Sequence, residues 1–450
     1  MKEKVFYNCS ECGYESVRWL GKCPNCGAWN SFAEEFKTKK RPGSSSVQAE
    51  PRTIEEIAID DFPRTLTGIG EFDRVLGGGI VKGSLILLAG EPGVGKSTLL
   101  VTAAGALAGH GKKVLYVTGE ESLSQVKLRA RRLGVSAPSL YLLAASEVTA
   151  IKQGLEQIHP DVVIVDSIQT VFDPDIPTTP GSVAQVRENA NFFMQFAKKS
   201  GTAVFLVGHI TKEGAIAGPK IMEHIVDVVL YFEGETRSLL RIMRAIKNRF
   251  GATSEIGVFS MEESGLKELP EAGAIFLSEG QPRLPGAVIF PAQEGTRTML
   301  VELQALVTPT YYGMPKRSVT GFDYNRGSLI VAVLEKKLHY NFGTYDVYIN
   351  VGGGLKLDEP GCDLAVALAC VSSFKDVPPL EHSVYMGEVA LTGEIRPIGQ
   401  VAQRLKEAAR LGFKNAVIPF ANLKEVPGDQ PMTVSPVRWL KEAVDLSLKL

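Results

Sequence analysis

The residues with the clearest chemistry lie between Gly90 and Thr98, where the chain reads GEPGVGKST. An apolar run ends at this segment, so the pattern G-x-x-x-x-G-K-S predicts a strand, a phosphate-binding loop and the start of a helix. Glycines let backbone N–H groups turn inward around an anion, because a Cβ would block its approach. Lys96 adds a positive charge for the β- and γ-phosphates of ATP, and the Ser97 hydroxyl is suited to Mg²⁺. The predicted nucleotide-binding residues here are Gly90, Glu91, Pro92, Gly93, Val94, Gly95, Lys96, Ser97 and Thr98.

Four of the six cysteines gather near the N-terminus, at Cys9, Cys12, Cys23 and Cys26, in the spacing C-x2-C-x10-C-x2-C. Two paired thiolates at this spacing are typical of a tetrahedral Zn²⁺ site, and four cysteine ligands leave no open position for catalysis. The sequence therefore predicts a structural zinc module, with redox dithiols or free thiols as the alternative. We expect Trp19 and Trp29 to pack beside the metal. The other two cysteines, Cys362 and Cys370, lie in apolar sequence and are expected in a core.

Length and charge limit the possible functions. A chain of 450 residues predicts two or three domains. The 49 basic and 50 acidic residues nearly cancel, so any nucleic-acid contact must come from a local patch. No apolar stretch reaches the roughly 18 residues of a membrane helix, and the N-terminus lacks the apolar core of a signal peptide. We therefore expect a soluble, cytoplasmic protein without a membrane partner.

The order of apolar and polar segments predicts the domains. Buried strands at Val114–Thr118, Val162–Val165 and Val204–Val207 alternate with helical stretches, which favours an α/β fold with a central parallel sheet. Asp166 ends the second of these strands, where a carboxylate can hold the Mg²⁺ shell. The predicted division is a zinc module (residues 1–36), a flexible linker (37–63), an ATPase domain (64–272) and a C-terminal α+β domain (273–450).

Two further segments carry a family resemblance. The stretch from Thr67 to Ile80 is similar to the entry of RecA-type ATPases, and KNRFG at Lys247–Gly251 is a signature of the bacterial RadA (Sms) family. Together with the cysteine knuckles and the phosphate loop, the chain resembles that family over essentially its whole length. The resemblance implies further functional residues. They are Glu120 for orienting the attacking water, with Glu121 in reserve, His209 as a polar sensor of the γ-phosphate, and Lys247 and Arg249 as a basic pair that reaches a neighbouring subunit's nucleotide.

The resemblance also implies loops that face the centre of a ring. The stretches 172–182 and 211–220 each follow a core strand and are rich in Gly, Pro and small residues, which is typical of mobile loops. We expect Lys212 and Lys220 to meet the phosphodiester backbone of single-stranded DNA without reading its sequence. A second basic cluster, Arg129, Arg131 and Arg132, is either another contact or a solvated helix face.

The C-terminal region resembles the proteolytic domain of Lon, whose chemistry needs a serine and a lysine. At the matching positions this chain has Gly361 and Ala402, which can neither attack a carbonyl nor accept a proton. The expectation is a protease fold without its reaction. Such a domain would serve as an assembly platform, with Lys316, Arg317 and Arg404 as a candidate surface for duplex DNA.

These observations lead to one main hypothesis and one alternative. The main hypothesis is a ring-forming, hexameric, ATP-driven motor of recombinational repair that uses ATP, Mg²⁺ and Zn²⁺. It would act on single-stranded and branched DNA and extend strand exchange or branch migration begun by the RecA recombinase. The alternative is a regulatory or scaffold ATPase that binds a protein partner without moving on DNA. A third possibility, an ATP-dependent protease, fails at Gly361 and Ala402.

Overall fold

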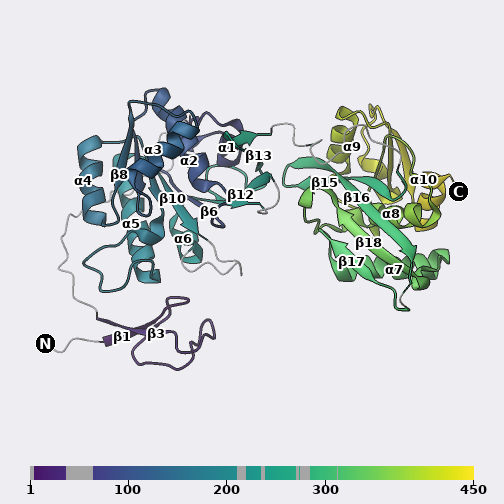
Figure 1. Cartoon of the computed structure of the whole chain (residues 1–450), viewed down its shortest axis with the longest axis horizontal. Coiled ribbons are helices and arrows are strands. Elements are labelled where there is room, and N and C mark those ends of the chain that lie inside the picture. Colours follow the sequence, from purple (N-terminus) through teal and green to yellow (C-terminus); the bar gives the residue numbers. More distant parts are fainter. Residues whose placement is uncertain are drawn as a thin grey trace, which may run out of the picture. The chain divides into compact units, whose positions relative to one another are not determined.

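The computed structural model describes residues 5–36, 64–209, 219–234, 239–269, 273, 284–311 and 313–449 (Figure 1). Its contacts divide the chain into two compact units, residues 1–270 and 271–450. Each unit is described by itself. The predicted linker, residues 37–63, lies outside the described residues. Within the ranges given above, no helix combines the length and the apolar character needed to cross a membrane.

A small three-stranded sheet forms the N-terminal module. Its antiparallel order is β2-β1-β3, with β1 Val5–Cys9, β2 Glu15–Ser16 and β3 Phe32–Phe36. The buried apolar side chains described there are Cys9, Cys23 and Phe32, with Leu20 packed against them. The expectation that Trp19 and Trp29 pack beside the cysteines is wrong, since they are 51% and 71% exposed. A module this small has room for only a few buried side chains, and these cysteines, Phe32 and Leu20 fill it.

The larger sheet of the first unit has nine strands among the described residues, in the order β14-β13-β12-β11-β6-β10-β9-β7-β8. Six of them are parallel, as the apolar runs predict, and three antiparallel strands extend one edge. The parallel strands are β6 Leu85–Gly90, β7 Val114–Thr118, β8 Leu140–Ala144, β9 Val162–Asp166, β10 Ala203–His209 and β11 Val228–Glu233. The antiparallel strands are β12 Leu240–Asn248, β13 Ile256–Glu262 and β14 Gly265–Glu268.

Helices cover both faces of this sheet. Helices α1 Gly70–Leu76, α2 Lys96–Gly109 and α3 Leu123–Arg132 pack with one core, which includes Phe72, Leu99 and Val126. Helices α4 Val148–Ile158, α5 Val183–Ser200 and α6 Pro219–Ile225 pack on the other, through residues such as Ile151 and Phe193. A short pair of strands, β4 Arg64–Thr65 and β5 Ile80–Val81, precedes β6. Because both faces are buried, the central strands are apolar throughout rather than alternating.

The second unit contains a mixed sheet of seven strands, counted over its described residues, in the order β17-β18-β16-β15-β19-β22-β23. Its central helix, α8 Asp363–Lys375, is buried along residues 363–372, which explains the uninterrupted apolar sequence over residues 364–371. The main strands are β15 Ala287–Glu294, β16 Arg297–Pro309, β17 Arg317–Thr320, β18 Tyr345–Val351, β19 Ser383–Tyr385, β22 Asn415–Pro419 and β23 Thr433–Val437. The remaining elements are a hairpin, β20 Glu388–Val389 with β21 Ile395–Arg396, and helices α7 Tyr324–Leu338, α9 Val401–Arg410 and α10 Leu440–Leu448.

Candidate functional site

The phosphate-loop sequence connects the fully buried strand β6 to helix α2. A Cβ on Gly90 would collide with the backbone carbonyl of Phe232. Gly95 has a φ of +114° and would place a Cβ 2.7 Å from Met261 Cε. Gly93 also has positive φ, +79°, but the space where its Cβ would lie is open. Packing therefore requires two of the glycines, and the third leaves the concave side of the loop accessible to a ligand.

Lys96 lies inside this loop and is only 4% exposed. Its Nζ donates to the carbonyls of Gly90 at 2.8 Å and Glu91 at 2.9 Å. Burial lowers the pKa of Lys96 to about 8, although the negative charges of Asp166, Glu120 and Glu91 oppose this change. The loop thus holds a poorly solvated cation next to three carboxylates, and an added anion would stabilise its charged form.

Asp166 lies at the end of β9, beside Thr118 of β7 in the parallel register. The Tyr116 hydroxyl donates to Asp166 Oδ2 at 2.6 Å. Tyr116 is 1% exposed, and burial together with the Asp166 charge raises the pKa of its phenol well above the usual value. The Asp166 side chain therefore has a permanent hydroxyl donor, and two neighbouring strands set its orientation.

The two adjacent glutamates after β7 have different surroundings. Glu120 Oε1 accepts a hydrogen bond from Ser167 Oγ at 2.6 Å and lies 3.7 Å from His209 Nε2. Glu121 instead forms an ion pair with Arg129 at 2.5 Å, and its backbone exchanges hydrogen bonds with the Thr118 hydroxyl. The geometry places Glu120, rather than Glu121, beside the lysine and the other polar strand ends.

His209 ends β10 and faces the same group of charges. Burial and the positive charge of Lys96 lower its pKa, while Glu120 and Asp166 act in the opposite direction. Its Nδ1 is buried without a hydrogen-bond partner among the described residues. Since β6, β7, β9 and β10 are parallel neighbours, their carboxyl ends bring Lys96, Glu120, Asp166 and His209 to one edge of the sheet.

The basic pair of the KNRFG segment, Lys247 and Arg249, lies at the other end of the strands, away from the carboxyl ends that carry Lys96, Glu120, Asp166 and His209. Asn248 of β12 pairs with Val228, which pairs with Ile86 near the start of β6, whereas Phe232 pairs with Gly90 at its end. Ile86 and Gly90 are four residues apart along β6, so the level of Asn248 and the level of Phe232 are about 13 Å apart. Lys247 Nζ donates to the Glu223 and Val226 carbonyls, and Arg249 Nη1 lies 3.4 Å from Asp227 Oδ1. The chain does not bring Lys247 and Arg249 to its own phosphate loop.

The expected DNA-facing loops are only partly described. Lys212 lies outside the described residues, as does the side chain of Lys220, whose backbone belongs to α6. The first loop, residues 172–182, is more ordered than its composition suggests. The Gln185 side-chain amide donates to the carbonyls of Asp173, Ile176 and Thr178 at 3.1 Å each. The expectation of a mobile loop is not supported here, because one buried amide ties three of its carbonyls.

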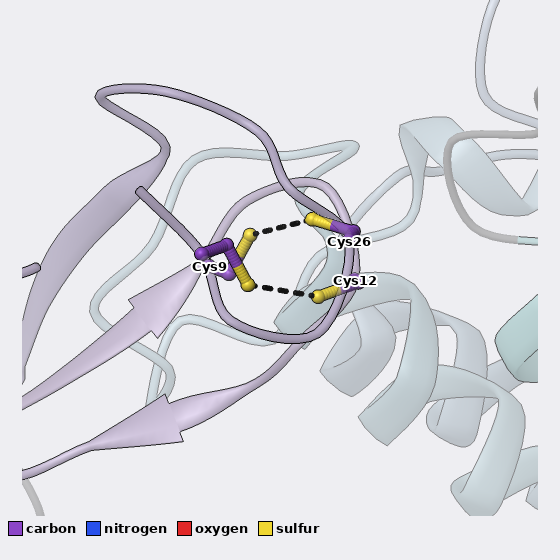
Figure 2. A group of neighbouring side chains, drawn as sticks. Cys9, Cys12 and Cys26 are labelled. Atoms are coloured by element: carbon purple, nitrogen blue, oxygen red, sulfur yellow. Dashed lines mark hydrogen bonds between the residues drawn. The ribbon is translucent and has the colours of Figure 1, made fainter. Parts of the chain in front are cut away.

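The cysteines fit a zinc ion (Figure 2). The four Sγ atoms lie within 4.8 Å of one another, and two of their pairs are 3.5 and 3.6 Å apart. Tetrahedral Zn–S bonds of about 2.3 Å would place sulfurs about 3.8 Å apart. Gly13 and Gly27 have φ of +71° and +76°, and each donates its N–H to the carbonyl of the first cysteine in its knuckle. The module is a zinc ribbon with four cysteine ligands.

Gly361, one of the two positions where the Lon-like resemblance implies a reactive group, lies close to Ile398 and Glu359. A Cβ on Gly361 would lie 3.4 Å from both Ile398 and Glu359. The neighbouring Cys362 is buried, which raises its thiol pKa well above the usual value, and its Sγ donates to the Glu359 carbonyl. Glu359 in turn pairs with Arg404 at 2.5 Å.

Arg404 cannot serve as a DNA contact in this fold, so that expectation is wrong. It is 3% exposed, donates to the carbonyls of Gly399 and Pro291, and stacks on Phe290. An arginine on an amphipathic helix looks solvated in the sequence, but this one points inward to neutralise Glu359. Of the other two candidates, Arg317 is tied to the Tyr345 and Phe342 carbonyls, and Lys316 Nζ lies 5.8 Å from the Tyr348 ring.

Three site residues escaped the sequence interpretation. Tyr116 lies within an apolar strand, where it is indistinguishable from a core aromatic. Ser167 follows Asp166 directly and is fully buried. Arg241 is also buried and donates to the Val94 carbonyl of the phosphate loop at 3.1 Å. A motif search does not single them out, because their roles depend on neighbouring strands. In the basic cluster on α3, Arg129 forms an ion pair with Glu121, a contact that the sequence interpretation also missed.

Comparison with known proteins matches three parts of the chain to family models. Residues 57–215 match the family model described as an AAA domain, and residues 7–34 match the rubredoxin metal binding domain. Residues 309–422 match subunit ChlI of Mg-chelatase. Among solved structures, a KaiC-like protein from Pyrococcus horikoshii has a TM-score of 0.40 at 20% identity, covering 46% of this chain and all of that one.

Curated relatives match nearly the full length. The chain is 49% identical over 455 residues to the DNA repair protein RadA of Bacillus subtilis, covering 99% of each chain. It is 48% identical to the RadA protein of Halalkalibacterium halodurans, again over 99% of each chain. It is also 48% identical to that of Listeria monocytogenes, covering 94% of this chain and 93% of the relative.

Proposed function

This chain belongs to the RadA family of DNA repair proteins, and we propose that it is a DNA-dependent ATPase that works as a ring-shaped motor in recombinational repair. The observation that carries the proposal is the convergence of Lys96, Glu120, Asp166 and His209 at the carboxyl ends of adjacent parallel strands. A cation and carboxylates gathered at one end of the sheet are the groups that phosphoryl transfer to water uses. The proposed division of the chain remains residues 1–36, 37–63, 64–272 and 273–450.

Each residue of the site has a proposed role in hydrolysis. Backbone N–H groups of residues 90–98 and the Lys96 ammonium bind the phosphates of ATP. Ser97 and Asp166 would hold Mg²⁺, which neutralises the charge of the β- and γ-phosphates when bound. Glu120 orients the attacking water, because one of its oxygens is anchored and the carboxylate lies near Lys96. His209 contacts the γ-phosphate and transmits its presence to the segment that follows β10.

The remaining cations of the site come from a second subunit. Lys247 and Arg249 lie on the sheet edge away from their own phosphate loop, about 13 Å along β6. Arg249 is 57% exposed, so it remains available to a neighbour. In a closed ring, every such edge meets the next subunit's nucleotide, and two cations then stabilise charge on the transferring phosphoryl group. This arrangement makes hydrolysis depend on assembly, and a hexamer is the proposed ring.

The nucleic acid that the central loops are proposed to bind is single-stranded DNA. The proposed substrate of the motor is branched DNA. The names of the curated relatives support a role in DNA repair. Lys212 and Lys220 are the proposed phosphate contacts. They follow β10 in the chain, so a change at His209 on binding or loss of the γ-phosphate can change the positions of these lysines. Extension of strand exchange or branch migration alongside the RecA recombinase is the proposed cellular task. The C-terminal domain is proposed to be an assembly platform without peptidase activity, since Gly361 and Ala402 occupy the reactive positions.

One experiment separates this proposal from its alternative, a scaffold ATPase that does not move on DNA. The ATPase rate is measured against added single-stranded DNA, while light scattering gives the mass of the assembly. A motor is expected to hydrolyse ATP several-fold faster with DNA and to form a ring, whereas a scaffold is indifferent to the strand. Lys96→Ala is the control, because its turnover must be lost with and without DNA. An unchanged rate at saturating DNA would reject the motor.

The action of Arg249 across an interface is tested by mixing subunits. Arg249→Ala should bind nucleotide normally and hydrolyse it slowly. An excess of Lys96→Ala protein supplies intact Arg249 side chains to the nucleotide sites of the Arg249→Ala subunits, so mixed rings should recover part of the rate. Mixed rings that recover nothing would mean that Arg249 acts within its own chain or not at all.

A further inference from the structure

The fully buried Ser167 makes its only side-chain hydrogen bond, among the described residues, to Glu120. The distance from Ser167 Oγ to Glu120 Oε1 is 2.6 Å. The Glu120 side chain itself is 51% exposed. A long carboxylate at the surface has several rotamers of similar energy, and a donor with no access to water removes most of that freedom.

The backbone around Ser167 explains why its hydroxyl stays in place. The N–H of Gly119 donates to the Asp166 carbonyl at 3.0 Å, which joins the ends of β7 and β9. The Thr170 hydroxyl donates to the Ser167 carbonyl at 2.8 Å. A Cβ on Gly119 would collide with that same hydroxyl, so the two segments lie in close contact. Ser167 and Glu120 are thus fixed to each other by the strand ends that carry them.

We propose that Ser167 is the positioning residue for Glu120: it anchors one carboxylate oxygen and thereby aims the other at the attacking water. Over the described part of the chain, no hydrogen bond reaches Oε2 of Glu120, so this oxygen is available to a water molecule. Ser167 touches neither the water nor the nucleotide in this scheme. The inference rests on the proposed role of Glu120 in hydrolysis and adds the residue that makes this role efficient.

The test is the kinetics of full-length Ser167→Ala with ATP and single-stranded DNA. Loss of the anchor frees the glutamate side chain, so kcat should fall about tenfold while KM for ATP stays within about twofold. Ser84→Ala is the matched control, because Ser84 is also fully buried, just before β6, and donates one hydrogen bond of 2.6 Å to the carbonyl of Val81 in β5. The control must keep the parental kcat. Thermal unfolding and binding of a fluorescent ATP analogue report the folding of each variant.

Two further variants separate the possible outcomes. Ser167→Cys keeps the packing and supplies only a weak donor, so its kcat should lie between those of the parent and Ser167→Ala. In the Glu120→Gln background, Ser167→Ala should produce no further loss, because the two residues act as one unit. A parental or raised kcat in Ser167→Ala, or an equal loss in the Glu120→Gln background, would overturn the inference. If Glu120→Gln itself keeps the parental rate, the proposed function of Glu120 fails instead.

Discussion

A shift from pH 7 to pH 9 should weaken nucleotide binding through the charge of Lys96. Burial lowers the pKa of this lysine to about 8 in the free protein. Bound phosphates favour the ammonium form, so the pKa in the complex must be higher. The protein therefore takes up a proton on binding when the pH exceeds about 8, and the affinity falls as the pH rises.

The size of the effect follows from the fraction of protonated lysine. With a pKa of about 8, Lys96 is roughly nine-tenths charged at pH 7 and one-tenth charged at pH 9. The dissociation constant should therefore rise about tenfold, which corresponds to about 1.4 kcal/mol. Among the neighbouring groups, His209 has a pKa below its ordinary value because of burial and the Lys96 charge, so it stays neutral over this range.

The assay is titration of a non-hydrolysable ATP analogue in excess Mg²⁺ at several pH values, since phosphate groups are fully ionised above about pH 7. Lys96→Met is the control, because it retains the bulk of the side chain without the titrating amine. This variant should bind more weakly and with no slope between pH 7 and pH 9. An equal affinity at both pH values in the parent, or the same slope in Lys96→Met, would refute the reasoning.

Three other perturbations test separate parts of the molecule. Cys26→Ala should release zinc and unfold only the N-terminal module, so metal content by mass spectrometry should fall while the core still hydrolyses ATP; a parent protein without zinc contradicts this. Arg404→Ala should lower the free energy of unfolding of the C-terminal unit by about 3 kcal/mol, because it leaves the half-buried Glu359 charge without its partner. Denaturation can be followed by Trp439 fluorescence in a variant whose other two tryptophans are phenylalanine, and a loss below about 1 kcal/mol would mean that the ion pair is dispensable. Tyr116→Phe removes the donor to Asp166, so the Mg²⁺ concentration for half-maximal ATPase activity should rise several-fold, and an unchanged requirement would separate Asp166 from the metal.

Several features were predictable from the sequence because they depend on neighbouring residues. The phosphate loop and the cysteine knuckles need particular residue types at short spacing, and the structure forms both where they were expected. The buried parallel strands were also predictable, since their apolar runs end within a residue or two of the observed bounds. The position of Asp166 at the end of β9 followed from the same runs.

Contacts between distant segments were not predictable in this way. The choice between Glu120 and Glu121 depends on Ser167 and Arg129, which come from the end of a different strand and from a helix. The exposure of Trp19 and Trp29 depends on how few side chains a small metal module can bury. The burial of Arg404 depends on Glu359, which lies 45 residues earlier.

The sequence by itself determined which chemistry is possible: a phosphate cradle with Lys96, a metal site of four cysteines, and a C-terminal domain that resembles a protease but has Gly361 and Ala402 at the positions expected to be reactive. The tertiary structure decided which side chains share one site and which are kept apart. It brought Glu120, Asp166 and His209 close to Lys96, and it placed Arg249 at the opposite end of the strands. The reason is physical: a motif acts through backbone turns within a few residues, whereas the distance between two strand ends is set by strand order and direction, which no single segment encodes.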